Sequence, residues 1–200
     1  MNLQKMRMTA EHLDRFAKIM SGFMKAGAIV CAVFAVLVLV FGESMFDTGH
    51  TTLDLDFVKL HLAPEYTDLN SAMRAYTVTG LAVGSAVLYG IFRGLHHLRL
   101  LLAPVKEGRP FEKEVSVQMK SIAWLILIIG AFIQIAGIVC RIFLSHAFPI
   151  EAFFASPAVT RIEYVYTMDF GFVLMFCLVM FLSRIFEYGQ QLQQESDETL

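Results

Sequence analysis

The chain contains four long apolar runs without any charged residue, and these runs most constrain its fold. They are residues 26–42, 76–92, 122–140 and 170–182. A helix needs roughly 20 apolar residues to cross about 30 Å of hydrocarbon, and the first three runs come close to that length. The fourth run is shorter and reaches it only if its helix starts near Tyr164, which places Asp169 inside the span. The pattern predicts an all-α membrane protein, a bundle of four transmembrane helices.

Most Lys and Arg residues lie on one side of the predicted spans. Of the 16 in the chain, 12 lie before the first span, between the second and the third, or just after the fourth. The other four are Lys59, Arg74, Arg141 and Arg161. Because short loops rich in Lys and Arg stay in the cytoplasm, we expect both termini and the middle loop to be cytoplasmic. The predicted location is the bacterial inner (cytoplasmic) membrane, which the chain crosses four times.

These considerations divide the chain into one membrane domain with nine segments. We expect a cytoplasmic amphipathic helix at 1–22, spans at 23–43, 75–95, 121–144 and 163–186, extracytoplasmic loops at 44–74 and 145–162, a cytoplasmic loop and helix extension at 96–120, and a cytoplasmic tail at 187–200. In the first loop Leu53, Leu55 and Phe57 alternate with two aspartates, which is typical of a half-buried strand. The alternation predicts a small β-ribbon that caps the bundle outside the cell.

The basic N-terminal segment has an apolar stripe at helical spacing. The stripe comprises Leu3, Met6, Ala10, Leu13, Ala17 and Met20, and the bases lie off it. Two interpretations stay open. The segment is either a basic helix lying on an anionic membrane face, or an extension of the first span that packs on its neighbours.

Polar residues within the spans are the first candidates for function, because they are costly in hydrocarbon and usually face the interior of a bundle. In the third span, Gly130, Gln134, Gly137 and Arg141 share one helix face and predict a buried seam. Arg141 and Asp169 fall at matching depths of antiparallel spans, which predicts an intramembrane ion pair. The pair acts either as a proton- or ligand-sensitive latch or as a structural lock between two helices.

Glycines in the second span are spaced for close helix approach. Gly80 and Gly84 form a small-xxx-small pattern. Such a pattern serves either packing within the chain or dimerisation, so a homo-oligomer is one expectation.

No catalytic or cofactor motif is present. The weak metal candidates are His50, Asp54, Asp56 and His61 in the first loop, and an acidic solvent-exposed face explains the same residues. The sequence contains no G-x-S-x-G, P-loop or H-E-x-x-H pattern. We therefore expect a protein that is not an enzyme, with no metal and no cofactor.

Two cytoplasmic stretches, KEGRPFEKEVSVQMKSIAWLILI and the tail IFEYGQQLQQESDETL, resemble the DUF2975 family of bacterial four-helix membrane proteins. The matching positions are Gly108, Pro110, Phe111 and Trp124, then Arg184, Gly189, Leu192, Gln193, Glu195, Asp197 and Thr199. Where the family pattern often has Asn, this chain has Val115. The resemblance implies no enzyme activity. By analogy it implies a membrane partner of small Cro-like helix-turn-helix regulators of transcription.

The turn and the tail are thus the candidate docking surface for a cytoplasmic regulator, formed by Arg109, Pro110, Phe111 and Leu192. In the alternative interpretation the turn and the tail pack on each other, with Phe111 buried against Leu192. Two rival functions belong to other classes. One is a small-solute or ion permease that uses Gln134, Arg141 and Asp169, and the other is a lipid-organising or assembly subunit. No direct contact with nucleic acid is expected.

Overall fold

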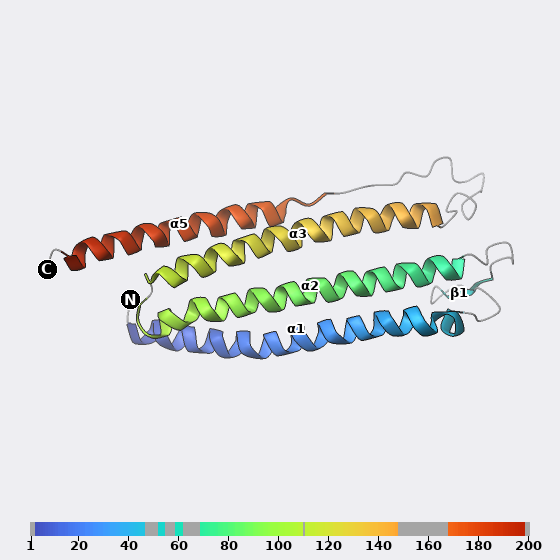
Figure 1. Ribbon diagram of the computed structural model, residues 1–200, viewed down its shortest axis with the longest axis horizontal. Coiled ribbons are helices and arrows are strands. Elements are labelled where there is room, and N and C mark those ends of the chain that lie inside the picture. The colour runs from blue at the N-terminus through green and yellow to red at the C-terminus, as the bar shows by residue number, and fades with distance from the viewer. Residues whose placement is uncertain are drawn as a thin grey trace. The chain divides into compact units, whose positions relative to one another are not determined.

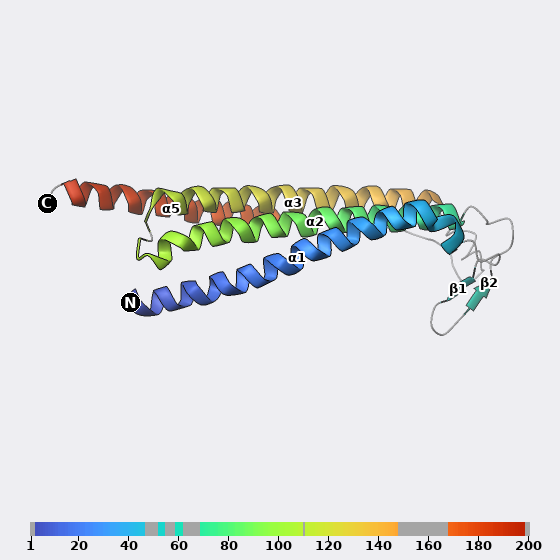
Figure 2. The ribbon, with the colours of Figure 1, turned by 60° about the horizontal axis from the view of Figure 1, so that its bottom comes forward.

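The computed structural model describes residues 3–46, 52–54, 59–61, 69–109, 111–147 and 168–198. These residues form helices α1 (Leu3–Phe46), α2 (Leu69–Lys106), α3 (Lys113–Ala147) and α5 (Gly171–Glu198), with strands β1 (Thr52–Asp54) and β2 (Lys59–His61) between α1 and α2 (Figures 1 and 2). All four helices are long and apolar enough to cross a membrane. The prediction of four membrane-spanning helices is confirmed at this level.

Strands β1 and β2 pair antiparallel, with Leu53 opposite Leu60 and Asp54 opposite Lys59. They lie in the alternating stretch for which the sequence predicts a ribbon. Its position outside the cell stays a prediction.

α1 runs through both the predicted N-terminal helix and the first span as one continuous helix, which agrees with the second interpretation of the N-terminal segment. The starts of two other helices differ from the prediction. α3 begins at Lys113 and not at Pro110, which lies outside the described residues. α5 begins at Gly171 and not near Tyr164, because the Asp169 Oδ1 atom accepts the Gly171 N–H at 2.8 Å and so satisfies a free donor of the first turn.

Contacts within the chain define two compact units. Unit 1 comprises residues 1–28, 86–133 and 169–200, and unit 2 comprises residues 29–85 and 134–168. Unit 1 contains the basic half of α1, the ends of α2 and α3 that flank the middle turn, and all of α5.

Small residues bring neighbouring helices together in unit 1. A Cβ atom added to Gly27 of α1 meets Leu88 of α2 at 3.3 Å. One added to Gly90 of α2 meets Ile129 of α3 at 2.6 Å, closer than real Cβ atoms approach. The absence of a side chain at Gly90 therefore sets the distance between α2 and α3, as is common between helices that pack in a membrane.

In unit 2, an arginine of α2 lies across α1. The Arg74 Nη2 atom donates to the backbone carbonyl of Leu39, and a Cβ atom added to Gly42 would lie 2.9 Å from the Arg74 Cδ atom. Gly42 leaves room for this arrangement.

Candidate functional site

The middle turn begins where α2 ends, and this end depends on a glycine. Gly108 has φ +84°, and its N–H donates to the Val105 carbonyl at 3.1 Å. The N–H of Arg109 donates to the Pro104 carbonyl at 3.0 Å. These two bonds and the left-handed glycine form a Schellman motif, which ends helices in a fixed geometry. The predicted glycine turn is confirmed, and it determines where Arg109 and Phe111 leave the helix.

Arg109 is held between two carboxylates of the same turn. Its Nη2 atom donates to Glu107, and its Nη1 atom donates to the Glu112 Oε1 atom at 2.9 Å. The hydrogen bond to Glu107 raises the pKa of the Arg109 guanidinium above its usual value, and the attraction of Glu112 adds to this. Arg109 therefore stays charged. The two bonds tie the end of α2 to the start of α3.

Phe111 packs on α5 and stays partly exposed. Its ring lies 5.8 Å from the ring of Phe186, measured between centroids. A Cβ atom added to Gly189 would lie 2.9 Å from the Phe111 ring. The ring nevertheless keeps 42% of its surface exposed, and Leu192 is 48% exposed. The prediction that the turn packs on the tail is thus confirmed. The prediction that Phe111 is buried against Leu192 is wrong, because the ring packs against Gly189, which has no side chain and lies about one turn earlier in α5.

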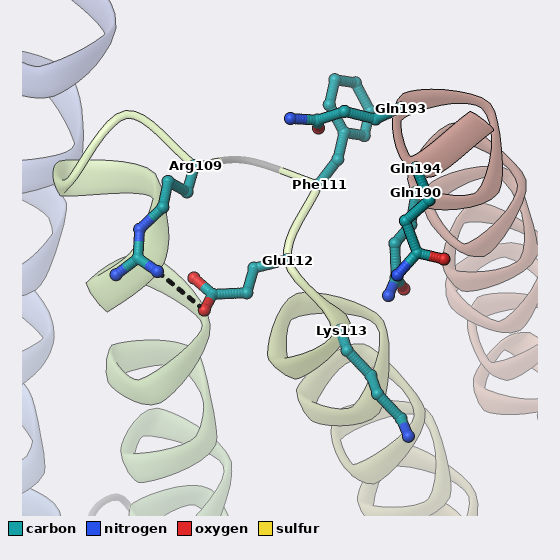
Figure 3. Close-up of a pocket in the computed structure, with 7 residues that line it drawn as sticks. All are labelled: Arg109, Phe111, Glu112, Lys113, Gln190, Gln193 and Gln194. Atoms are coloured by element: carbon teal, nitrogen blue, oxygen red, sulfur yellow. Dashed lines mark hydrogen bonds and ion pairs between the residues drawn. The ribbon is translucent and has the colours of Figure 1, made fainter. Parts of the chain in front are cut away.

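A hollow of about 360 Å³ opens between the turn and α5. Figure 3 shows the seven side chains that line it, with the Gln193 amide beside the Phe111 ring. The lining comprises Arg109, Phe111, Glu112 and Lys113 from the turn and Gln190, Gln193 and Gln194 from α5. Among the described residues, the Glu112 Oε2 atom is buried and has no hydrogen-bond partner. The hollow thus combines one aromatic ring, charged side chains of both signs and three amides.

Beneath the hollow, α3 and α5 are joined by a buried polar contact. The Ser183 hydroxyl, fully buried, donates to the Ser116 carbonyl at 2.9 Å. Val115, at the position where the DUF2975 pattern often has Asn, is only 1% exposed. Val115, Ser116 and Ser183 are thus all buried where α3 and α5 meet.

An ion pair adds to the same junction. The Lys120 Nζ atom of α3 donates to Glu187 of α5, which also accepts from Arg184 at 3.0 Å. Sequence reasoning missed both contacts of Glu187. The contact with Arg184 had a signal in the sequence, since the two residues are three apart and therefore neighbours on the α5 surface. The contact with Lys120 depends on how α3 and α5 face each other.

A second polar cluster joins α1 to α2. The Asp14 carboxylate accepts from the Arg99 Nε atom at 3.0 Å and from the Lys106 Nζ atom at 2.5 Å. The Arg7 Nε atom donates to the backbone carbonyl of Lys106 at 2.6 Å. These contacts support the second interpretation of the N-terminal segment, in which it packs on its neighbours.

Histidine 97 of α2 also bonds across to α3. Its Nδ1 atom lies 2.7 Å from the Gln118 Oε1 atom, within hydrogen-bond distance. Within the described residues, no group of three or more His, Cys, Asp or Glu side chains is placed to hold a metal ion. Of the weak metal candidates, His50 and Asp56 lie outside the described residues, and the side chains of Asp54 and His61 are not described.

The predicted seam of α3 is confirmed at one position. A Cβ atom added to Gly130 would overlap the Phe172 side chain of α5, whereas one added to Gly137 meets no described atom within 4 Å. Gln134 is half-buried and Arg141 is exposed. Close packing thus occurs at the glycine that faces a neighbouring helix. The spacing of the glycines alone does not identify which glycine that is.

The same lesson holds for α2. Cβ atoms added to Gly80 and Gly84 meet no atom of the described chain within 4 Å. Their role in packing within the chain stays a prediction, whereas Gly90 closely approaches Ile129 of α3. Dimerisation through Gly80 and Gly84 stays a prediction.

Asp169 differs from its predicted setting. It lies before α5 and is exposed, whereas the sequence analysis predicts that it lies inside the fourth span. Its carboxylate caps the helix through Gly171. The ion pair with Arg141 stays a prediction, without the helical position of Asp169 on which it was based.

The surface of the helices defines the class of the protein. Large apolar side chains point outward along the candidate spans, with Leu174 71% and Phe181 67% exposed. Water disfavours such extended apolar surfaces, whereas acyl chains cover them. The chain is a multi-pass membrane protein.

Within that class, the chain belongs to the DUF2975 family. The family model, described as a protein of unknown function, matches residues 59–200, which include the turn, the hollow and the tail. Comparison with curated proteins and with solved structures gives no match.

Proposed function

We propose that this protein is a non-catalytic regulatory partner that binds a small cytoplasmic helix-turn-helix regulator at the hollow between the turn and α5. The single observation that carries the proposal is the setting of Phe111. Its ring is 42% exposed among charged and amide side chains, where water rather than acyl chains is the expected solvent.

The composition of the hollow supports a protein partner. Aromatic and arginine side chains dominate the binding energy of protein interfaces, and a polar rim commonly surrounds them. Here Phe111 and Arg109 lie together, and Gln190, Gln193 and Gln194 supply donors and acceptors around them.

The turn is also prearranged for binding. The Schellman motif fixes the exit from α2, Arg109 is tied to Glu107 and Glu112, and Phe111 rests on Gly189. A surface that is ordered before binding loses less conformational entropy when a partner arrives.

The cytoplasmic location of the hollow rests on the distribution of Lys and Arg, and the nature of the partner rests on the analogy with family members. The bacterial inner membrane is part of the same proposal. A reporter fused after Leu200 tests the orientation, and activity of that reporter on the outer side would contradict it.

Pull-down of the tagged full chain tests the docking surface. We compare the wild type with Phe111→Ala and with a truncation after Tyr188, and we use Gln191→Ala as the control because Gln191 is exposed on α5 but does not line the hollow. The proposal expects a soluble helix-turn-helix protein with the wild type and the control, and its loss with the other two. The same partners in all four samples would eliminate the docking surface.

A further inference from the structure

Helix α1 has two different apolar faces between residues 7 and 25. One face carries Ala10, which is 3% exposed, and Ala17, which is 1% exposed. It is part of the stripe that the sequence singles out. The other face carries large side chains that are 47% to 68% exposed, namely Met8, Leu13, Phe16, Ile19 and Phe23. This second face precedes the apolar run at 26–42. Leu13 also belongs to the sequence stripe, whereas Met8, Phe16, Ile19 and Phe23 lie off it.

The rotation of this segment about its axis is fixed. Asp14 lies between Ala10 and Ala17 on the buried face and binds Arg99 and Lys106 of α2. Phe16 follows Asp14 by two residues, which is a rotation of about 200° around the helix. Phe16 therefore points away from α2, and Phe23, seven residues later, points the same way.

Basic side chains border the exposed apolar face. Arg15, Lys18 and Lys25 are all exposed. By helical position they lie between the buried face and the outward-facing phenylalanines. Glu11 is the acidic side chain on the same border, since the carboxylate of Asp14 is occupied by α2. The border keeps a net positive charge.

We propose that this outer face of α1 is a binding site for anionic phospholipid. Phe16, Ile19 and Phe23 contact lipid on this face of the helix, and Arg15, Lys18 and Lys25 bind the phosphate groups of neighbouring headgroups. Apolar side chains beside bases are the combination that binds anionic bilayers, because burial and charge attraction add.

The continuity of α1 favours lipid over a protein partner as the occupant. The segment continues without a break into the apolar run of α1, so its outward face meets the lipid that surrounds the same helix. The site is separate from the proposed docking surface, because the residues that line the hollow come from the turn and α5.

The test uses the full chain in nanodiscs that contain phosphatidylglycerol and phosphatidylcholine. The lipids that remain bound after extraction into detergent are counted by native mass spectrometry. Wild-type protein should retain phosphatidylglycerol in preference to phosphatidylcholine. Each Lys or Arg near an anionic surface contributes about fivefold, so R15Q/K18Q/K25Q should lower this preference about tenfold or more.

The control, R93Q/R109Q/K113Q, removes the same charge from elsewhere in unit 1 and should keep the preference. Circular dichroism establishes that each variant keeps its helices. An unchanged ratio in R15Q/K18Q/K25Q would overturn the proposal. So would an equal loss in the control, which would indicate only an effect of net charge, or a shift from dimer to monomer in the mass spectrum, which would identify the face as a contact between copies.

Discussion

The α1–α2 and α3–α5 junctions of unit 1 use charge in different ways. At the first, the Asp14 carboxylate of α1 forms ion pairs with two basic side chains of α2. At the second, Glu187 takes one base from α3 and one from its own helix, and a buried Ser183–Ser116 bond lies beside it. Both junctions contain buried residues, Ala10 and Ala17 at the first and Val115, Ser116 and Ser183 at the second, and the second adds a buried hydrogen bond to its charges.

This difference predicts that packing changes at α3–α5 have the largest effect. Gly130→Val should destabilise the protein by about 1–3 kcal/mol, because the new side chain overlaps Phe172 and overpacking has costs of this order. The midpoint of thermal unfolding in detergent measures the effect. Gly137→Val is the matched control, and an equal loss in both would show that α3–α5 packing at Gly130 is not the cause.

A charge change at α1–α2 should come next. Asp14→Ala removes both bonds to α2 and leaves Arg99 and Lys106 without this partner, which should cost about 1–2 kcal/mol for partly exposed charged bonds. The loss should shrink at high salt, because salt screens the pairs in the wild type. Glu11→Ala, on the exposed border, is the control. A salt-independent loss would contradict the charge-based account.

The corresponding change at α3–α5 should be smaller. Glu187→Ala should cost about 0.5–1 kcal/mol, because the Ser183–Ser116 bond and the Phe111–Phe186 contact remain. Unfolding of Asp14→Ala and Glu187→Ala in the same detergent gives the comparison directly. If Glu187→Ala proves the more damaging of the two, the ranking of the junctions is reversed.

The smallest effect should come from the start of α5. Asp169→Ala should cost about 0.5–1 kcal/mol through loss of the cap on Gly171, whereas Asp169→Asn keeps an accepting oxygen and should be close to neutral. The two variants also separate capping from charge. A large loss in Asp169→Asn would favour the ion pair with Arg141 instead.

The apolar runs predicted the four helices well, because a long uncharged run has few other ways to satisfy its backbone in lipid. Gly108 likewise predicted the turn, because a positive φ is favourable only without a Cβ atom. Both predictions depend on the local sequence.

Helix contacts were less predictable, because they depend on which residue faces which helix. Gly80 and Gly90 have equally suitable spacing, yet of the two only Gly90 meets a side chain in the described structure. The apolar stripe of the first 25 residues identified Ala17 correctly but gave no sign that Phe16, one position away, begins a second face. The start of α5 was missed because Asp169 was assigned to the interior of a span rather than to a cap.

The seat of Phe111 on Gly189 makes position 189 a spacer for the ring. Adding one methyl group there, as in Gly189→Ala, would push the aromatic edge outward while its chemistry stayed the same. The position of the Phe111 ring, and with it the affinity for any protein that binds there, therefore depends on the residue at position 189 of α5.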